Sequence, residues 1–528
     1  MFLEIFNILA SKIKNDLGLT EVVMDELFDG FVHCVYKIKN KHNFFILKIR
    51  GDHFKNNSAI SIDSKQISFE ATVLKALEDS GMINFPKLIK FYRKESAMLI
   101  ENIGGKSNNF LFLLNNNVFK IRDYFKIAEF ISKLLIKLNR ESINVSAVAV
   151  ENNFVSNIVY RINRHKLNHF FSLEKRINNL NKYFICGDLS PKNIFYFKND
   201  VKICDLENFQ KAPIEFDVYY LLAHIILHNL YRDNLFKIID NFEKGLKIIK
   251  DKMQFTDQEI MIYCLSVMLY RLDNDEIKYE LFNLSNNQKN KLLLKIYFIL
   301  SNQTKFNNLN QSLRYLINEE TNELETKILE VNQDKIIRLL IKNNSKKIFD
   351  NITTIETFEA PFYHPAPFVN NKLDELIRHL SIITDNFTKS LDSMGAYMRI
   401  REENKEYELT LKYHIEKGGV NYKMEREINV FIDSKEFLGE IKDWLIKNKF
   451  TNVSYEIKQR ISFINRIHGT RIDIDNWQKP SLPTYLEIEG FDKNSINDTC
   501  KMLGFDIKDL SSISGKELFK RYKVKRGI

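Results

Sequence analysis

The sequence predicts an α+β protein of two or three domains, with a small sheet and many helices in its N-terminal part and an antiparallel β-barrel in its C-terminal part. Three observations favour this class. The chain has 528 residues, which is too many for one ordinary core. Its first hundred residues contain short strand-like runs, and helical periodicity dominates residues 216–340. Beyond Pro361, Pro365 and Pro367, long segments alternate between charged and apolar residues.

The N-terminal elements follow from local patterns. Residues 32–38 and 44–49 are β-type runs separated by a polar turn, which predicts a hairpin. Further elements are expected as a helix at 68–77, strands at 85–91 and 97–101, and a helix at 124–138. Thr256 and Glu259 precede an apolar run at capping-box spacing, so another helix should begin there.

The segment 301–350 is rich in Asn, Gln, Lys and Glu and contains no Pro or Gly. We predict that it is a helical connector, because it lacks the residues that interrupt helices. The predicted domain boundaries are therefore 1–315 for the first domain, 316–350 for the connector and 351–528 for the last domain.

The C-terminal segment predicts strands that carry charge at every second position. Strands are expected at 397–401, 407–414, 422–432, 453–464, 470–474 and 485–489, with one helix at 435–447. Arg399 with Arg401, and Glu487 with Glu489, would each share one face of a strand. Such a sheet either exposes its charged face to water or closes into a barrel with a charged lumen.

Composition limits the classes of function. The formal net charge of +10 favours an anionic partner such as a nucleotide, a polyphosphate or a nucleic acid, although no dense Lys/Arg tract marks a nucleic-acid arm. The five cysteines are scattered and form no CxxC pair, which argues against disulfides and zinc and favours the cytoplasm. The most apolar run, 219–230, is too short to span a bilayer, so we expect a buried helix and no membrane association.

Residues suited to phosphoryl transfer occur in order along the first domain. Asp188 and Asn193 lie on one loop, and Asp205 ends the strand that follows. A phosphoryl-transfer site needs a carboxylate near the accepting hydroxyl and oxygen ligands for magnesium, which these residues can supply. It also needs a lysine on the nucleotide phosphates, and Lys48 lies in an apolar strand with Glu70 as its natural ion-pair partner.

With these motifs, the first ~300 residues resemble the aminoglycoside phosphotransferase and choline kinase-like family, a branch of the protein-kinase fold. The resemblance implies a bilobal domain that uses ATP and Mg²⁺ to phosphorylate a small-molecule hydroxyl. It implies that Asp188 is the catalytic base or hydroxyl-positioning group and that Asn193 and Asp205 bind magnesium. Lys48, held by Glu70, would contact the ATP phosphates.

The resemblance extends to the hinge and to the catalytic loop. Residues 99–105 resemble the hinge between the lobes, where the backbones of Glu101 and Ile103 would receive adenine. Asp217 matches a structural position that braces the catalytic loop. The sequence departs from the family at Cys186, where His is usual, at Ser190, where His is frequent, and in the phosphate loop 28–34, which has a single glycine.

The C-terminal strands resemble the CYTH family, the triphosphate tunnel fold that includes inorganic and thiamine triphosphatases and one class of adenylate cyclase. The segments that carry the resemblance are 395–401, 410–412, 456–460, 471–475 and 486–490. The resemblance implies that a triphosphate or polyphosphate binds to Arg399, Arg401, Lys412, Lys458 and Arg460. Glu487 and Glu489 would bind Mg²⁺ or Mn²⁺.

In this chain, the strand that corresponds to the first strand of the tunnel family is expected to be incomplete. In the family this strand carries alternating glutamates and then a lysine, whereas the best match here, 355–361, lacks the glutamate pair and the lysine. The leading hypothesis is a bifunctional enzyme that joins a phosphotransferase to a triphosphatase. One alternative is a tunnel that binds nucleotide or polyphosphate without cleaving it and regulates the kinase. Another is processing of RNA 5′-triphosphate ends, which needs a basic surface with stacking aromatic residues.

Overall fold

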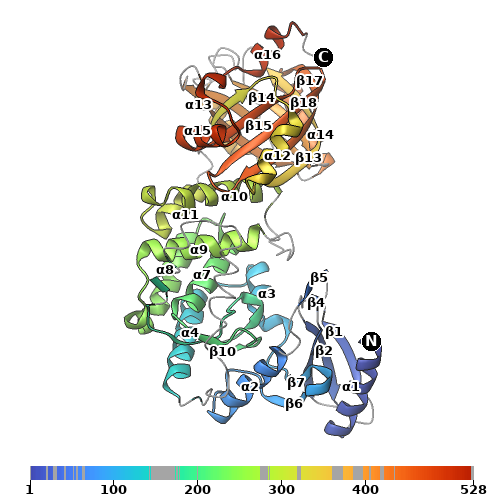
Figure 1. The fold of residues 1–528 in the computed structure, drawn as a ribbon, viewed down its shortest axis with the longest axis vertical. Coiled ribbons are helices and arrows are strands. Elements are labelled where there is room, and N and C mark those ends of the chain that lie inside the picture. Colours follow the sequence, from blue (N-terminus) through green and yellow to red (C-terminus); the bar gives the residue numbers. More distant parts are fainter. Residues whose placement is uncertain are drawn as a thin grey trace. The chain divides into compact units, whose positions relative to one another are not determined.

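The computed structural model describes residues 2–18, 22–27, 33–40, 43–51, 53–54, 57–61, 66–141, 143, 173, 176–177, 179–198, 200–273, 284, 286–317, 323–359, 373–383, 396–403, 406–416, 421–432 and 434–524. The chain forms two compact units (Figure 1). The first comprises Met1–Ser285 with Phe306–Gln311, and the second comprises Asn286–Lys305 with Ser312–Ile528.

The first unit begins with helix α1 (Phe2–Leu17) and a five-stranded antiparallel sheet in the order β1-β2-β3-β7-β6. Its strands are β1 (Val23–Leu27), β2 (His33–Asn40), β3 (Asn43–Arg50), β6 (Leu88–Tyr92) and β7 (Ala97–Glu101). Helix α2 (Gln66–Asp79) packs against β6 and β7. The predicted hairpin, helix and two later strands are confirmed, whereas residues 28–32 of the predicted phosphate loop lie outside the described residues.

The rest of the first unit consists of helices and short hairpins. Its helices are α3 (Phe110–Asn115), α4 (Ile121–Arg140), α7 (Glu215–Asn229), α8 (Leu235–Gly245) and α9 (Asp257–Leu272). Its short strands are β4 (His53–Phe54), β5 (Asn57–Ser61), β8 (Tyr183–Ile185), β9 (Ile194–Phe197), β10 (Asp200–Ile203) and β11 (Gln210–Ala212). Every residue of α7 is buried, as its apolar sequence predicted. The capping box of Thr256 and Glu259 at the start of α9 is also confirmed.

The second unit is a large antiparallel sheet with helices on its surface (Figure 1). Its strands are β12 (Glu323–Ile328), β13 (Lys346–Glu359), β14 (Ala396–Glu403), β15 (Glu406–Glu416), β16 (Lys423–Ile432), β17 (Thr451–Asn465), β18 (Thr470–Lys479) and β19 (Tyr485–Gly490). Its helices are α10 (Asn286–Ser301), α12 (Gln333–Lys342), α13 (Asp374–Ile383), α14 (Lys435–Lys447), α15 (Lys493–Met502) and α16 (Gly515–Arg521), and α11 (Leu309–Ile317) spans the boundary of the units.

The strand order of this sheet returns on itself. The order is β12-β16-β15-β14-β13-β17-β18-β19, and β12 pairs with β16 on one side and with β19 on the other. The pairing of β12 with β16 has three residue pairs and is the shortest strand pairing in this sheet. A sheet that closes in this way has an inner and an outer face, and each strand alternates between them.

The outer face of the sheet is apolar and lies under helices. Met398 and Ile400 of β14 pack with residues of α13 and α14, including Leu380 and Ile441. On the other side, Ile488 of β19 belongs to a cluster that includes residues of α12 and α15. The alternate, charged positions therefore face inward. An ordinary sheet with its charged face in water does not describe this arrangement.

The predicted helical connector differs from the structure. Within residues 316–350, α12 is helical, but β12 and the first part of β13 are strands. Over such short stretches, the polar residues of these strands resemble those of a solvent-exposed helix. These segments form a sheet because they pair with strands more than a hundred residues away. None of the described helices has both the length and the apolar character that crossing a membrane requires.

Candidate functional site

Lys48, Glu70 and Asp205 meet in the first unit. Lys48 Nζ donates to both carboxylate oxygens of Glu70, at 2.8 and 2.7 Å, and to Oδ1 of Asp205 at 2.9 Å. The Lys48 and Glu70 side chains are buried, while Asp205 is about one-fifth exposed. The predicted ion pair is therefore present, and the same ammonium group also binds the carboxylate that follows β10.

The positions of Lys48 and Glu70 follow from the pattern of apolar residues around them. Leu47 and Ile49 of β3 belong to the core under α1, so Lys48 lies on the opposite face of the strand. Glu70 lies on the buried stripe of α2, at helical spacing from Ile67 and Leu74. Burial lowers the pKa of Lys48, but Asp205 and Glu70 outweigh it and raise the pKa above its usual value. Lys48 is therefore a cation, as a phosphate-binding lysine must be.

The loop that carries Asp188 is held by Asp217. The carboxylate of Asp217, in the first turn of α7, accepts backbone hydrogen bonds from Cys186 (2.7 Å) and Gly187 (2.9 Å). Within the loop, Ser190 N donates to Asp188 Oδ1 (3.3 Å). Asn193 Nδ2 donates to the Asp188 carbonyl oxygen at 3.1 Å. Asp217 thus fixes the loop backbone just before Asp188.

The loop is also joined to the strand end that carries Asp205. Cys204 N donates to the Asn193 carbonyl oxygen at 3.0 Å, which places Asn193 beside the residue that precedes Asp205. Asp205 has a φ of +67°, in the left-handed region that Asp tolerates better than most residues. A strained backbone at this position is typical of a functional site.

Cys186 stands where a loop histidine is usual in the resembled family. Its thiol is buried, and burial together with Asp217 raises its pKa well above the ordinary value. Since the reactive form of cysteine is the thiolate, Cys186 is not a nucleophile. Cys186 contacts Asp217 through both its backbone N–H and its thiol.

The two predicted hinge residues differ in what their backbones can offer. The N–H of Glu101, at the end of β7, donates to the Lys87 carbonyl oxygen at 2.9 Å. That donor is used within the protein. Ile103 is buried and follows the strand, and the binding of adenine by either backbone stays a prediction.

Sequence reasoning missed a second ion pair beside the first. Arg50 at the end of β3 binds Glu207, two residues after Asp205, and Gln66 Nε2 donates to the Glu207 carbonyl oxygen at 2.9 Å. The partners are more than 140 residues apart in sequence, so no local pattern signals them. Together with Lys48, Arg50 ties β3 to the Asp205 segment at two points.

Position 187 requires a glycine because of both its backbone conformation and the atoms around it. Its φ is +82°, and a Cβ there would lie 1.9 Å from the backbone oxygen of Asn208. We expect Gly187→Ala to destabilise the first unit by roughly 3 kcal/mol or more, because left-handed strain and overpacking add. The matched control is Gly81→Ala, with φ +72° and nothing within 4 Å of the new Cβ, which should lose only about 1 kcal/mol. Urea unfolding measures both, and equal losses would contradict the packing argument.

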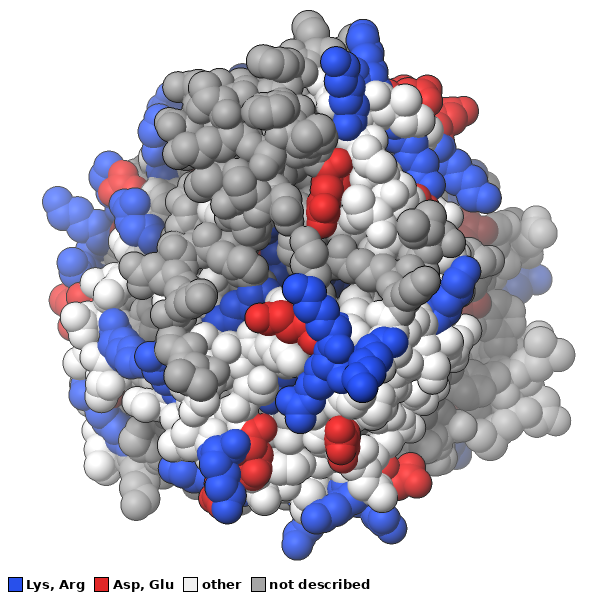
Figure 2. Space-filling model, turned by 90° about the horizontal axis from the view of Figure 1, so that it is seen from above, with Lys and Arg blue, Asp and Glu red and all other residues white. Residues whose placement is uncertain are grey.

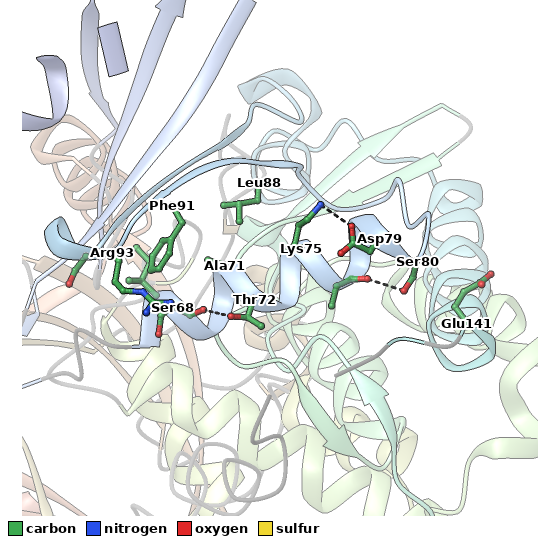
Figure 3. Close-up of a pocket in the computed structure, with 13 residues that line it drawn as sticks. Ser68, Ala71, Thr72, Lys75, Asp79, Ser80, Leu88, Phe91, Arg93 and Glu141 are labelled. Atoms are coloured by element: carbon green, nitrogen blue, oxygen red, sulfur yellow. Dashed lines mark hydrogen bonds and ion pairs between the residues drawn. The ribbon is translucent and has the colours of Figure 1, made fainter. Parts of the chain in front are cut away.

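The larger of the two described cavities lies elsewhere in the first unit. It has a volume of about 1230 Å³ and is lined mainly by residues of α2 and β6 (Figure 3). Figure 3 shows Lys75 bonded to Asp79 on the helix, with Leu88 and Phe91 across from them. None of the predicted site residues is among those that line this cavity. Volume alone therefore does not locate the chemistry.

A second cluster lies on the inner face of the closed sheet. Glu325 and Lys327 of β12 stand opposite Glu489 and Glu487 of β19 in the strand register. The carboxylates of Glu325, Glu487 and Glu489 lie within 4.8 Å of one another. Lys327 Nζ lies 2.8 Å from Glu325 and 3.0 Å from Glu487. Three carboxylates at this spacing form an oxygen set that suits Mg²⁺ or Mn²⁺.

We expected a first strand that lacks alternating glutamates and a lysine, but strand β12 carries all of them. Residues 323–327 read Glu-Leu-Glu-Thr-Lys, which are the alternating glutamates and lysine that the segment 355–361 lacks. In that segment, Glu356 of β13 bonds Lys442 of α14 (2.8 Å) and Asn452 (3.2 Å) on the outer side, whereas Glu325 and Lys327 line the inner cavity. Glu325 and Lys327 are thus the residues that sequence reasoning missed, although their i, i+2 spacing could have found them.

The basic residues predicted to bind phosphate divide into two groups. Arg399 and Lys412 both contact Glu427, at 3.0 and 2.9 Å, and Arg401 lies two residues further along β14. Lys458 and Arg460 of β17 contact Asp475 of β18 at 2.5 and 2.7 Å. Acidic partners therefore balance these bases in the structure. A bound anion would compete with Glu427 and Asp475.

A cavity of about 200 Å³ connects these groups. Six basic and four acidic side chains line it: Lys327, Arg399, Lys412, Lys423, Lys458 and Arg460, with Glu325, Glu359, Glu456 and Glu487. Burial raises the pKa of Glu325, but Lys327 and Lys412 outweigh it and lower the pKa to about 2. The carboxylate is ionised at neutral pH. The lining bases could bind an anionic ligand in exchange for Glu427 and Asp475, which pair with four of them.

Comparison with known proteins gives matches among solved structures. No protein-family model and no curated protein matches the sequence. A choline/ethanolamine kinase family protein from Mesorhizobium loti has 11% identity and a TM-score of 0.35, with 59% of this chain and 99% of that protein covered. Amicoumacin kinase, solved with AMP-PNP and Ca²⁺, has 14% identity and a TM-score of 0.36, with 53% and 88% covered.

A third match is a conserved hypothetical protein from Pyrococcus furiosus, with 18% identity and a TM-score of 0.26, and with 37% of this chain and 99% of that protein covered. The two kinases match the N-terminal part of the chain. All three identities are below 25% and all three TM-scores are below 0.5. We therefore base the functional assignment on the residues of the two sites.

Proposed function

We propose that the first unit is a phosphotransferase that moves the γ-phosphoryl group of ATP to the hydroxyl of a small molecule. The observation that carries this proposal is Lys48 Nζ, bonded at once to Glu70 and to Asp205 (2.7 and 2.9 Å). A lysine fixed between a helix carboxylate and a strand-end carboxylate is the arrangement that positions nucleotide phosphates beside a metal ligand.

In the proposed reaction the acceptor oxygen forms a bond to the γ-phosphorus while the bond to the β–γ bridging oxygen breaks. The electron pair of that bond leaves with ADP. Asp188 orients the acceptor hydroxyl and takes its proton, which is the role a loop carboxylate can fill when its backbone is held, as it is here by Asp217. Lys48 binds the phosphates and keeps them in line for attack.

Asn193 and Asp205 fit the role of magnesium ligands. Asn193 Nδ2 is used as a donor to Asp188 O, so Oδ1 is the side-chain atom that can coordinate a cation. Asp205 offers a carboxylate that is partly exposed. When bound, magnesium would neutralise the negative charge that develops on the phosphates during transfer.

For the second unit we propose metal-dependent hydrolysis of a triphosphate compound. The carboxylates of Glu325, Glu487 and Glu489 would hold the metal, and the basic residues of the cavity would bind phosphate oxygens. The cavity of about 200 Å³ is smaller than the roughly 300–1,000 Å³ of ordinary small-molecule pockets. This favours a phosphate chain, rather than a whole nucleotide, inside the sheet.

Two alternatives for the second unit have different outcomes in the same assays. A regulatory tunnel would bind triphosphate and gain thermal stability without releasing phosphate. RNA 5′-end processing would prefer triphosphorylated RNA over free triphosphate and would weaken steeply with salt. Figure 2 shows Lys and Arg interspersed with Asp and Glu on the displayed face, and not a continuous basic surface among its described residues.

The proposals are tested on the whole chain in two assays. With ATP, Mg²⁺ and a panel of hydroxyl compounds, we expect ADP and a phosphorylated product. With inorganic triphosphate and Mn²⁺, we expect phosphate release that chelation abolishes. Absence of transfer to every compound would reject the first proposal, and stabilisation without phosphate release would favour the regulatory alternative for the second.

A further inference from the structure

Arg271, near the end of α9, is held in a fixed orientation against α7. Its Nε donates to His224 Nε2 at 2.9 Å, and its Nη2 donates to the Tyr220 hydroxyl at 2.6 Å. The guanidinium carbon also lies 5.6 and 5.4 Å from the ring centroids of Tyr220 and Tyr270. Because its orientation is fixed in advance, such an arginine loses little side-chain entropy when it binds a ligand.

His224 orients this arginine. The histidine is fully buried, and its Nδ1 lies 2.8 Å from the Tyr220 carbonyl oxygen. Nδ1 therefore carries the proton, and Nε2 is free of hydrogen and accepts from Arg271. Burial, and then the charge of Arg271, lowers the pKa of His224 well below its ordinary value. The histidine stays neutral, so the positive charge of the pair resides on Arg271.

The same region of α7 lies next to the loop that carries Asp188. Asp217 in the first turn of the helix binds the loop backbone, and His224 follows about 10 Å further along the axis. Lys192, on the loop between Asp188 and Asn193, also acts electrostatically on His224. Arg271 and Lys192 thus bring positive charge to the part of the unit where an acceptor hydroxyl would approach Asp188.

We propose that the phosphoryl acceptor carries an anionic group, a carboxylate or a phosphate, that Arg271 binds while Asp188 orients the hydroxyl. This inference rests on the proposed phosphotransferase function. The planar guanidinium matches two oxygens of one anionic group, which a point charge does not. A cationic acceptor such as choline or an amino sugar would be repelled by Arg271 and Lys192.

A series of three-carbon compounds of similar size separates these classes. Glycerate carries a carboxylate, glycerol 3-phosphate a phosphate, glycerol no charge and 3-amino-1,2-propanediol an ammonium group, and all four have hydroxyls. Calorimetry on the full chain with AMP-PNP and Mg²⁺ measures their binding without turnover. We expect one or both anions to bind at least about tenfold more tightly than glycerol and the amine.

Variants of Arg271 show whether this preference depends on the arginine. Arg271→Met should weaken binding of the anion about tenfold or more, and Arg271→Lys should restore part of the loss by keeping the charge. The matched control is Arg176→Met, an exposed arginine that also contacts α9, through Glu259 at 3.0 Å, and it should leave anion binding unchanged. Urea unfolding of each variant verifies that the first unit is folded.

The outcomes are decisive without knowledge of the natural acceptor. Tighter binding of the amine than of either anion would overturn the inference, as would anion binding that Arg271→Met leaves intact, or no anion binding at all. Phosphoryl transfer from ATP is measured separately on the same compounds. Anion binding that depends on Arg271, without any transfer, would keep the anion site and count against the phosphotransferase.

Discussion

Asp205→Ala is expected to abolish ATP-dependent phosphorylation, with kcat falling about a thousandfold or more, while triphosphate hydrolysis by the second unit continues. The change removes one of the two proposed magnesium ligands and one of the two carboxylates that contact Lys48. Electrostatic stabilisation is the main catalytic contribution in phosphoryl transfer, and a loss of about 4 kcal/mol corresponds to a thousandfold. Initial rates of ADP formation and of phosphate release from triphosphate measure the two activities.

The first unit should stay folded in this variant. Lys48 keeps Glu70, with contacts of 2.8 and 2.7 Å, so no buried ammonium is left without a partner. Asp200→Ala is the matched control, because Asp200 begins the same β10 strand and bonds Asn84 (2.9 Å) instead of Lys48. It should retain phosphorylation. Loss of both activities in Asp205→Ala would argue against two independent sites.

Much of the first site could be predicted because each of its residues contrasts with its local pattern. Lys48 interrupts an apolar strand, and Glu70 lies on the stripe of α2 that is otherwise apolar. A charge in such a position is retained only when a partner compensates its burial. The structure then brings Lys48, Glu70 and Asp205 within hydrogen-bond distance, as the order of the motif implied.

Other parts of the first unit had no local signal. Arg50 and Glu207 are ordinary charged residues in the sequence, and their contact depends on the packing of β3 beside the Asp205 segment. Arg271 is the last basic residue of a helix, where such residues are common for reasons of the helix dipole. Only the contacts with His224 and Tyr220 distinguish it.

The second unit shows how pairing overrides local pattern. Six strands were predicted because their apolar positions are frequent enough to mark one face. β12 has six residues, and its inner positions are charged, so its sequence resembles the polar segments around it. Its identity as a strand comes from five pairs with β19, which lies about 160 residues later. The same pairing brings Glu325 beside Glu487 and Glu489, so missing the strand also meant missing the third carboxylate of this cluster.

Glu325→Gln is expected to reduce metal-dependent hydrolysis of triphosphate about a hundredfold or more. Glutamine keeps the volume of the side chain but removes one of three clustered carboxylates, and a metal site contributes several kcal/mol to the transition state. Binding of triphosphate without metal should become tighter, because the change removes a carboxylate that faces Lys327 (2.8 Å) and Lys412 (3.3 Å). Turnover and metal-free affinity should therefore move in opposite directions, which loss of fold would not produce.

The two candidate first strands can be distinguished with a matched pair of Glu to Gln changes. Glu356→Gln alters the strand suggested by the sequence, where Glu356 bonds Lys442 and Asn452, and it should leave hydrolysis unchanged. Lys327 and Lys412 keep Glu487 (3.0 Å) and Glu427 (2.9 Å) in Glu325→Gln, so that variant should also stay folded. Phosphate release with Mn²⁺ and calorimetry with triphosphate and chelator measure both variants. Loss of hydrolysis in Glu356→Gln, with Glu325→Gln active, would place the metal outside the β12 cluster and reject the site proposed for the second unit.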